Sequence, residues 1–280
     1  MVSGAIYTIA FNGTDAAGNA ATEVSVTGIT FDTTAPTLAQ ISAVPTPSND
    51  TTPSFIFTTD EAGTLTTNIS QGFSTSASVS TGSNQTITFN TLPEGTYSSK
   101  TITVTDAAGN DTSLNIPTFV IDTTSPTMTI TSTTSGVSDG STTNDATIAL
   151  TFTSSEATAN FAQSDITLGN GTLSSFTESS STVYTATFTP SGQGACTIDV
   201  AADTYTDTAG NNNLAATQFN WLFDTVAPIL SQVTAILTPS NDTTPSFVFT
   251  TNEAGTLSTN ISQGFSTSAS VSSGSNQTVT

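Results

Sequence analysis

The stretch TDAAGNDTSLNIPTFVIDTTSPT, residues 105–127, decides how the chain is divided. It joins a turn-forming pentamer, Asp-Ala-Ala-Gly-Asn at 106–110, to an Asp-Thr-Thr-Ser-Pro pentamer at 122–126. The same couplet occurs at 15–19 with 32–36, and again as DTAGN and DTVAP at 207–211 with 224–228. Self-similarity at long spacing is the signature of a repeat protein, so the couplet predicts where one repeat ends and the next begins.

A longer repetition sets the size of the units. Residues 38–88 return at 230–280, and most of the differences exchange Ile with Val, Ser with Thr or Asp with Asn. Because the second copy has no counterpart of the closing strands, we expect the chain to be a piece of a longer array and the last repeat to be unstable unless another chain supplies those strands. The predicted parts are a partial repeat at 1–32, a complete short repeat at 33–122, a complete long repeat at 123–224 and a partial short repeat at 225–280.

Alternation of apolar and polar residues predicts strands along the whole chain. It is clear in TPSFIFTT at 52–59, SKTITVTD at 99–106, ATIALTFT at 146–153, VYTATFT at 183–189 and TQFNWLF at 217–223. Turn residues separate these segments, and no segment has a helical period. About seven strands in a unit of about 100 residues is typical of an immunoglobulin-like sandwich. The predicted fold is therefore all-β, a set of tandem immunoglobulin-like β-sandwiches arranged as an elongated row.

Charge and composition exclude several classes of function. The chain has 1 Lys or Arg, 21 Asp or Glu and a formal net charge of −20. Nucleic acid and anionic membranes need basic residues, so neither is an expected partner, and no apolar run is long enough for membrane insertion. With no His, a Ser-His or Cys-His nucleophile cannot form, and no catalytic residue is predicted. Cys196 stands alone, which excludes an intramolecular disulfide. Divalent cations are the natural counter-charge for such a chain.

The repeats resemble the Ig-like repeats of giant bacterial surface adhesins and related extracellular proteins. The resemblance rests on the couplet DxAGN…DTTAPT and, in the long repeat, on TFTSSEATANFAQSDITLGNGTLSSF at 151–176. It covers essentially the whole chain and implies an extender that holds a distal binding domain away from the cell. It also implies an extracellular or cell-surface location, with the secretion signal outside these residues, and calcium that stiffens the domain junctions.

Acidic residues recur at one pole of each predicted repeat. In an Ig-like topology the linker that enters a unit lies near its B–C loop, between the second and third strands, and its F–G turn, before the last strand. Oxygen ligands gathered from separate segments suit calcium, whereas apposed carboxylates without a cation repel. Asn252 replaces Asp60 in the later copy, so Asp60 is at most an auxiliary ligand. The predicted calcium ligands are Asp32, Asp60, Glu61 and Asp106 for the short repeat, Asp122, Glu156 and Asp207 for the long one, and Asp224 and Glu253 for the last.

Two interpretations of these acids stay open: they are calcium ligands, or they only form turns and a stiff linker. For the chain as a whole, the sequence favours a structural stalk whose partners are neighbouring repeats and, in a filament, other copies. A phage fibre or a self-assembling extracellular filament is an alternative, and a carbohydrate- or ice-binding module is another. Trp221, the lone Trp, shares a face with Phe219 and Phe223 and is expected in the core rather than in a sugar site.

Overall fold

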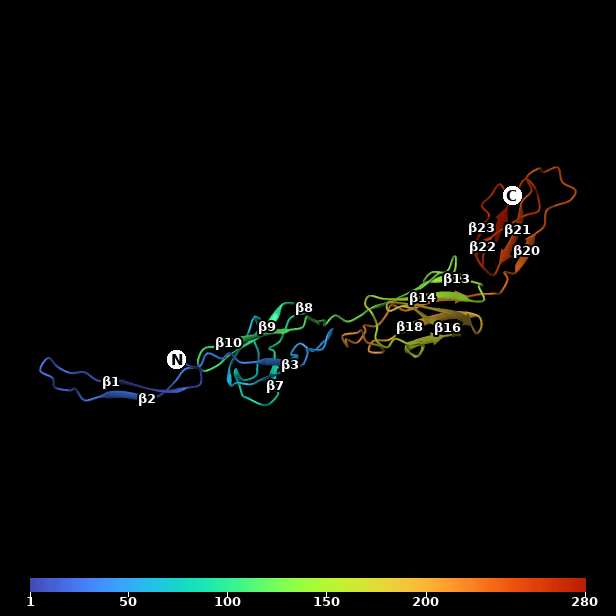
Figure 1. Ribbon diagram of the computed structural model, residues 1–280. Helices are drawn as coiled ribbons and strands as arrows, with labels where there is room; N and C mark the ends of the chain where they lie inside the picture. The colour runs from blue at the N-terminus through green and yellow to red at the C-terminus, as the bar shows by residue number, and fades with distance from the viewer.

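The computed structural model describes residues 1–280 and shows four parts in an elongated row (Figure 1). An N-terminal hairpin is followed by two β-sandwiches and by a C-terminal part, and the hairpin and the C-terminal part lie at opposite ends of the row. The structure confirms the all-β prediction: it has strands throughout and one 3-10 turn, η1 (Gln163–Asp165). No helix long and apolar enough to cross a membrane is present.

The N-terminal hairpin pairs β1 (Ile6–Phe11) with β2 (Val24–Thr30) antiparallel, and these two strands form a sheet of their own. No second layer covers its apolar side chains. Phe11 is 69% exposed and Val26 is 57% exposed. The hairpin thus shows strand pairing without a core.

The first sandwich has its own core of 14 buried residues, among them Phe55, Phe57 and Phe119. Its sheets have the strand orders β3-β4-β7 and β10-β9-β5-β6, and β8 pairs with β11. Side chains of the central strand β4 alternate between the core and solvent, as the sequence predicts for a strand with one buried face. The strands are β3 (Leu38–Ser42), β4 (Ser54–Thr59), β5 (Gly63–Thr67), β6 (Ser78–Val79), β7 (Gln85–Thr88), β8 (Gly95–Tyr97), β9 (Lys100–Thr105), β10 (Asp111–Ile116) and β11 (Phe119–Ile121).

The second sandwich packs two four-stranded sheets, β12-β14-β17-β16 and β13-β19-β18-β15, around 18 buried residues. Trp221 lies in this core with its ring edge-on to Phe188, 4.8 Å between centroids, and Cys196 is fully buried. The strands are β12 (Met128–Ser132), β13 (Ser141–Thr143), β14 (Ile148–Ser154), β15 (Ile166–Gly169), β16 (Gly171–Ser180), β17 (Val183–Pro190), β18 (Gly194–Val200) and β19 (Phe219–Phe223).

The C-terminal part, residues 225–280, repeats one portion of the first sandwich. The sheet β20-β21-β24 corresponds to β3-β4-β7, and the pair β22-β23 corresponds to β5-β6. Nothing in residues 225–280 corresponds to β8–β11, so one face of this part is uncovered. The strands are β20 (Leu230–Thr234), β21 (Phe247–Thr251), β22 (Gly255–Thr256), β23 (Ser270–Val271) and β24 (Gln277–Val279).

Candidate metal centres at the joints between repeats

The Asp-x-Ala-Gly-Asn pentamer forms a tight turn organised by its own first residue. The Asp106 Oδ1 atom accepts the backbone N–H groups of Ala108, Gly109 and Asn110 at 2.8, 2.7 and 2.9 Å. The Asn110 side chain donates to Oδ2 at 2.8 Å, and Gly109 has a φ of +96°, a conformation that favours glycine. These hydrogen bonds, that of the Asn110 side chain first, lower the pKa of Asp106.

The turn also makes contact with an Asp-Thr-Thr linker, the second half of the couplet. The Asn110 side chain donates to the carbonyl oxygen of Asp32 at 3.2 Å, and the Asn211 side chain donates to that of Asp122 at 2.9 Å. Each turn therefore holds the Asp-Thr-Thr linker that enters its own sandwich, not the linker that follows it. The Asp32 carboxylate accepts the Thr34 N–H at 3.0 Å, which bends the linker at its start.

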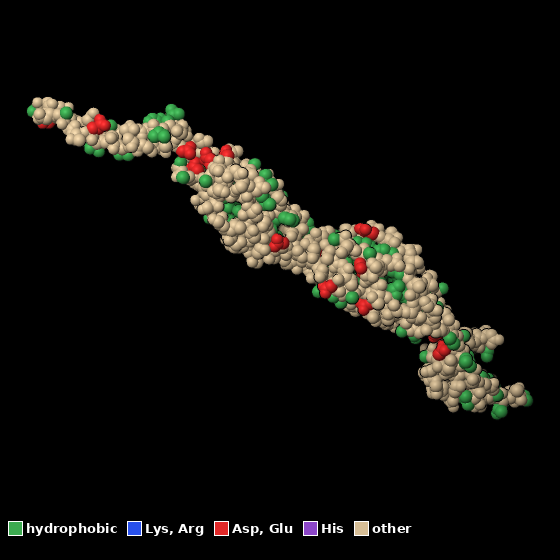
Figure 2. All heavy atoms as spheres, turned by 90° about the horizontal axis from the view of Figure 1, so that it is seen from below, with side chains coloured by type: hydrophobic (Ala, Val, Ile, Leu, Met, Phe, Trp, Pro, Cys, Tyr) green, Lys and Arg blue, Asp and Glu red, His purple; other side chains and the backbone are tan.

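Two groups of three carboxylates result from this arrangement, one at the entrance of each sandwich. In each group a linker Asp, a B–C Glu and an F–G Asp bring one oxygen apiece within 4.8 Å of one another. Figure 2 shows acidic side chains gathered where the thin hairpin meets the first sandwich. The groups are Asp32, Glu61 and Asp106 in the first sandwich, and Asp122, Glu156 and Asp207 in the second.

The glutamate of each group has an oxygen with no protein partner. Oε2 of Glu61 and Oε2 of Glu156 are buried and accept no hydrogen bond. Burial, and then the nearby Asp122 and Asp207 carboxylates, raise the pKa of Glu156. Burial and the neighbouring Asp32 and Asp106 raise the pKa of Glu61 in the same way. An unpaired buried oxygen facing two carboxylates fits a hard cation such as calcium, which binds oxygen ligands only.

Asp60, predicted as an auxiliary ligand, lies outside the group. Its carboxylate accepts the Thr37 N–H at 2.6 Å, which ties the B–C turn to the start of β3 and lowers the pKa of Asp60. Ser155 makes the corresponding bond to the Thr127 N–H at 2.9 Å, and Asn252 to the Ile229 N–H at 2.6 Å. Any short side chain with an oxygen serves here, which accounts for the exchange of Asp, Ser and Asn.

The predicted third group is incomplete in the C-terminal part. Asp224 accepts the Val226 N–H at 2.9 Å and the Gln193 side chain at 3.1 Å. Glu253 accepts the Asn252 side chain at 3.2 Å. These two acids do not form a group of three, because residues 225–280 have no F–G turn to supply the third carboxylate.

Two residues that sequence analysis did not select also build the joint between the sandwiches. The Asn49 side chain donates to the Gly210 carbonyl at 2.8 Å, and its backbone N–H donates to the Ala209 carbonyl at 3.0 Å. From the first sandwich, Glu94 accepts the Thr123 hydroxyl at 2.9 Å, and this bond with that of Thr124 lowers the pKa of Glu94. The motif PSND, present at 47–50 and again at 239–242, was the available signal for Asn49.

Removing the Asn49 side chain is expected to loosen this joint. Asn49→Ala deletes the bond to Gly210, worth about 0.5–1.5 kcal/mol, while each sandwich keeps its own core. We expect a wider distribution of interdomain orientations in residual dipolar couplings of residues 33–224, with the stability of both sandwiches unchanged. Asn84→Ala, which removes an exposed amide away from the joint, is the matched control. Equal orientational order in the two variants would contradict a role for Asn49 in the joint.

The fold and these joints define a class of protein, a row of β-sandwiches connected by short, hydrogen-bonded linkers. Comparison with protein families then names it: a family described as "Bacterial Ig-like domain" matches residues 42–123, and a second family with the same description matches residues 122–222. The chain belongs to the bacterial Ig-like domain proteins and carries two such domains in tandem. It is a structural repeat region.

No curated protein matches the chain. Among solved structures, a similar chain is the Bacteroides ovatus mixed-linkage glucan utilization locus SGBP-B in complex with a mixed-linkage heptasaccharide. The two are 13% identical with a TM-score of 0.23, over 99% of this chain and 76% of that one. A likeness this distant says nothing about the function of this chain.

Proposed function

We propose that this chain is part of the stalk of a large bacterial extracellular or cell-surface protein of the adhesin type, and that calcium stiffens its joints. The observation that carries the proposal is the group of three carboxylates repeated at both joints, with one buried glutamate oxygen left unpaired in each. Each group unites a linker with two loops of the sandwich it enters. An ion held there would fix the linker against the sandwich.

The donor set favours calcium over other ions. It consists of oxygens alone, since the chain has no His and its single Cys is buried in the core of the second sandwich. Calcium accepts six to eight oxygens in a flexible geometry, whereas magnesium requires a nearly ideal octahedron. When bound, calcium would supply the positive charge that these acids lack. Asp32 and Asp122 would hold it from the linker side, and Glu61 or Glu156 with Asp106 or Asp207 from the sandwich side.

The rest of the chain supports a spacer rather than a catalyst. Each complete sandwich has a separate core, so repeats can be added in a row without altering one another. Only 8% of the residues are charged, and a single basic side chain offers almost no site to trypsin-like proteases. Such a surface suits a long, soluble connection outside the cell.

Solution scattering of residues 33–224, in calcium and then in excess chelator, tests the proposal. In calcium we expect an extended pair of sandwiches with a narrow distribution of shapes. In chelator the mutual repulsion of Asp122, Glu156 and Asp207 is expected to release the linker, so the distribution should broaden and the mean length should change. Identical scattering profiles in both buffers, together with no calcium binding by calorimetry, would reject calcium at the joint. The linker proline and the packing of the two sandwiches would then set the angle between them.

A further inference from the structure

We propose that the two complete sandwiches differ in their resistance to tension, so that the first sandwich unfolds before the second when the chain is pulled along its length. The first sandwich would then lengthen the stalk under tension while the second stays folded. The inference rests on the stalk function proposed above, since only a chain held at both ends is under tension, and it does not depend on calcium. Its basis is the pair of strands that joins the two ends of each sandwich.

Tension acts along the strands of each sandwich. Each sandwich receives the chain at one end of the row and passes it on at the other (Figure 1). A segment near the start of each sandwich lies parallel to its last strand: β13 pairs with β19, and Ser48 pairs with Ile121 of β11. Pulling draws one segment toward the entrance and the other toward the exit. Their evenly spaced hydrogen bonds are then stretched together, and breaking them together takes more force than breaking them one at a time.

The second sandwich has a long contact of this kind, which we call its parallel clamp and define as residues 139–143 against β19 and Asp224. Strand β13 pairs in register with residues 221–223. At one end the Gly140 N–H donates to the Asn220 carbonyl at 2.8 Å, and at the other the Asp224 N–H donates to the Thr143 carbonyl at 2.9 Å. The Asp139 carboxylate accepts the backbone N–H and the side-chain amide of Asn220 at 2.8 and 2.9 Å. The clamp is therefore bonded at both of its ends and along its length.

The first sandwich has a shorter clamp at the same place. Ser48 donates its N–H to the Val120 carbonyl at 3.1 Å, and its carbonyl accepts the Asp122 N–H at 3.0 Å. The next bond involves a side chain, because the Val120 N–H donates to Oγ1 of Thr46 at 2.9 Å. Backbone pairing is thus limited to the single bridge at Ser48.

The sequence accounts for the difference between the two clamps. The bond from the linker Asp is the same in both, so the two segments can be aligned by counting back from it. Pro45 then takes the place of Gly140, and because proline has no N–H, the first sandwich cannot form the bond that Gly140 donates. Val44 takes the place of Asp139 and offers no side-chain acceptor.

The neighbouring strands favour the same order. Strand β19 lies between β13 and β18 and pairs with β18 over all five of its residues. Strand β11 has three residues and forms a two-stranded sheet with β8. At the entrance, β12 pairs with β14 without a shift, whereas the register of β3 and β4 shifts between Gln40 and Ser42, which disrupts the ladder there. The second sandwich is therefore joined more firmly at both of the strands that tension reaches first.

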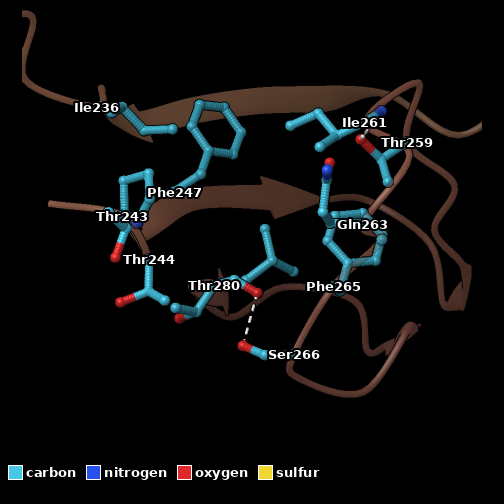
Figure 3. Close-up of a pocket in the computed structure, with 13 residues that line it drawn as sticks. Ile236, Thr243, Thr244, Phe247, Thr259, Ile261, Gln263, Phe265, Ser266 and Thr280 are labelled. Carbon is cyan, nitrogen blue, oxygen red and sulfur yellow. Dashed lines mark hydrogen bonds between the residues drawn. The ribbon is translucent and has the colours of Figure 1, made fainter.

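This comparison concerns the two complete sandwiches. In residues 225–280 no last strand lies beside the segment that follows Ile236, the counterpart of Val44. Figure 3 shows Ile236 and Phe247 beside an open space instead. The inference makes no use of this part of the chain.

Single-molecule pulling of the full chain at constant force tests the inference, with chelator present throughout so that calcium plays no part. The first sandwich should release about 300 Å of chain, the second about 350 Å and the C-terminal part about 190 Å, so the steps can be told apart. We expect the 300 Å step before the 350 Å step, at a rate about tenfold higher or more, because the first clamp has fewer hydrogen bonds. Equal rates or the reverse order would overturn the inference. A compact shape in the scattering experiment above would overturn the stalk function instead.

A variant of the clamp sharpens the test. Asp139 is exposed, and Asp139→Ala removes two bonds of the second clamp while leaving the core intact, so the second sandwich should unfold about tenfold faster under the same force. Glu178→Ala removes an exposed acid of β16, outside the clamp, and should leave the rate unchanged. Without tension, in urea, Asp139→Ala should change the unfolding rate less, because the strands can then separate in any order. A rate under tension that does not change, or that changes no more than the rate in urea, would overturn the inference.

Discussion

Glu156→Gln is expected to have opposite effects on the second sandwich in chelator and in calcium. In chelator at neutral pH it should raise the free energy of unfolding, because a neutral amide no longer repels Asp122 and Asp207. In calcium it should remove most of the stabilisation that the ion confers. For an ion present at 100 times its Kd, that stabilisation is about 2.7 kcal/mol.

The pH dependence in chelator follows from the same residue. Burial and the Asp122 and Asp207 carboxylates raise the pKa of Glu156 above its ordinary value of 4.5. Between 4.5 and the raised value the folded state binds more protons than the unfolded state, so stability falls as the pH rises through this window. Below pH 4.5 Glu156 is protonated in both states and the penalty vanishes, and above the window the full penalty persists. In the Glu156→Gln variant the free energy of unfolding should change less with pH in this window.

Urea denaturation of residues 33–224, followed by Trp221 fluorescence, reports on the second sandwich because this is the only Trp in the chain. Glu178→Gln is the matched control, since Glu178 is exposed on β16, outside the carboxylate group. If Glu156→Gln changed the free energy of unfolding by the same amount and in the same direction in calcium and in chelator, the result would contradict an ion at this joint. It would assign Glu156 to ordinary packing instead.

The sequence predicts the architecture well because repetition and alternation are local signals. Apolar residues two positions apart lie on the same face of a strand, and this spacing can be read from the sequence without knowing the tertiary structure. The structure buries all the residues of two such segments: Phe55 and Phe57 in one, and Ile148, Leu150 and Phe152 in the other. The loops that carry acids follow from the topology, because the linker, the B–C loop and the F–G turn of an Ig-like domain meet at one pole. The structure accordingly brings Glu61 and Glu156 into groups with acids from the linkers and turns.

What topology alone cannot predict is the direction of single side chains. Asp60 and Glu61 are adjacent, yet Asp60 caps the Thr37 N–H while Glu61 faces the linker and the F–G turn. Asn49 and Glu94 were not predicted because their hydrogen-bond partners lie in another repeat or in the linker. The way two sandwiches are placed relative to each other produces no periodic pattern in the sequence of either sandwich.

Phe152→Ala is expected to give the largest loss of stability among these variants, and the loss should be confined to the second sandwich. Phe152 is fully buried on β14, the strand between β12 and β17, and its ring lies 6.1 Å from that of Phe161. Truncating a buried Phe costs about 3–5 kcal/mol, through lost burial and the cavity left behind. A domain of this size has only about 5–15 kcal/mol of stability in total, so the variant should unfold far more readily.

Calorimetry of residues 33–224 provides the measurement. The transition of the second sandwich should move to markedly lower temperature, while that of the first should stay in place because the two cores share no residue. Thr153→Ala, on the same strand with its side chain exposed, is the control and should change stability by no more than about 0.5 kcal/mol. If both transitions moved together, the two sandwiches would unfold as one unit, and the joint contacts of Asn49 and the linker would have to contribute far more than the hydrogen bonds described here can supply.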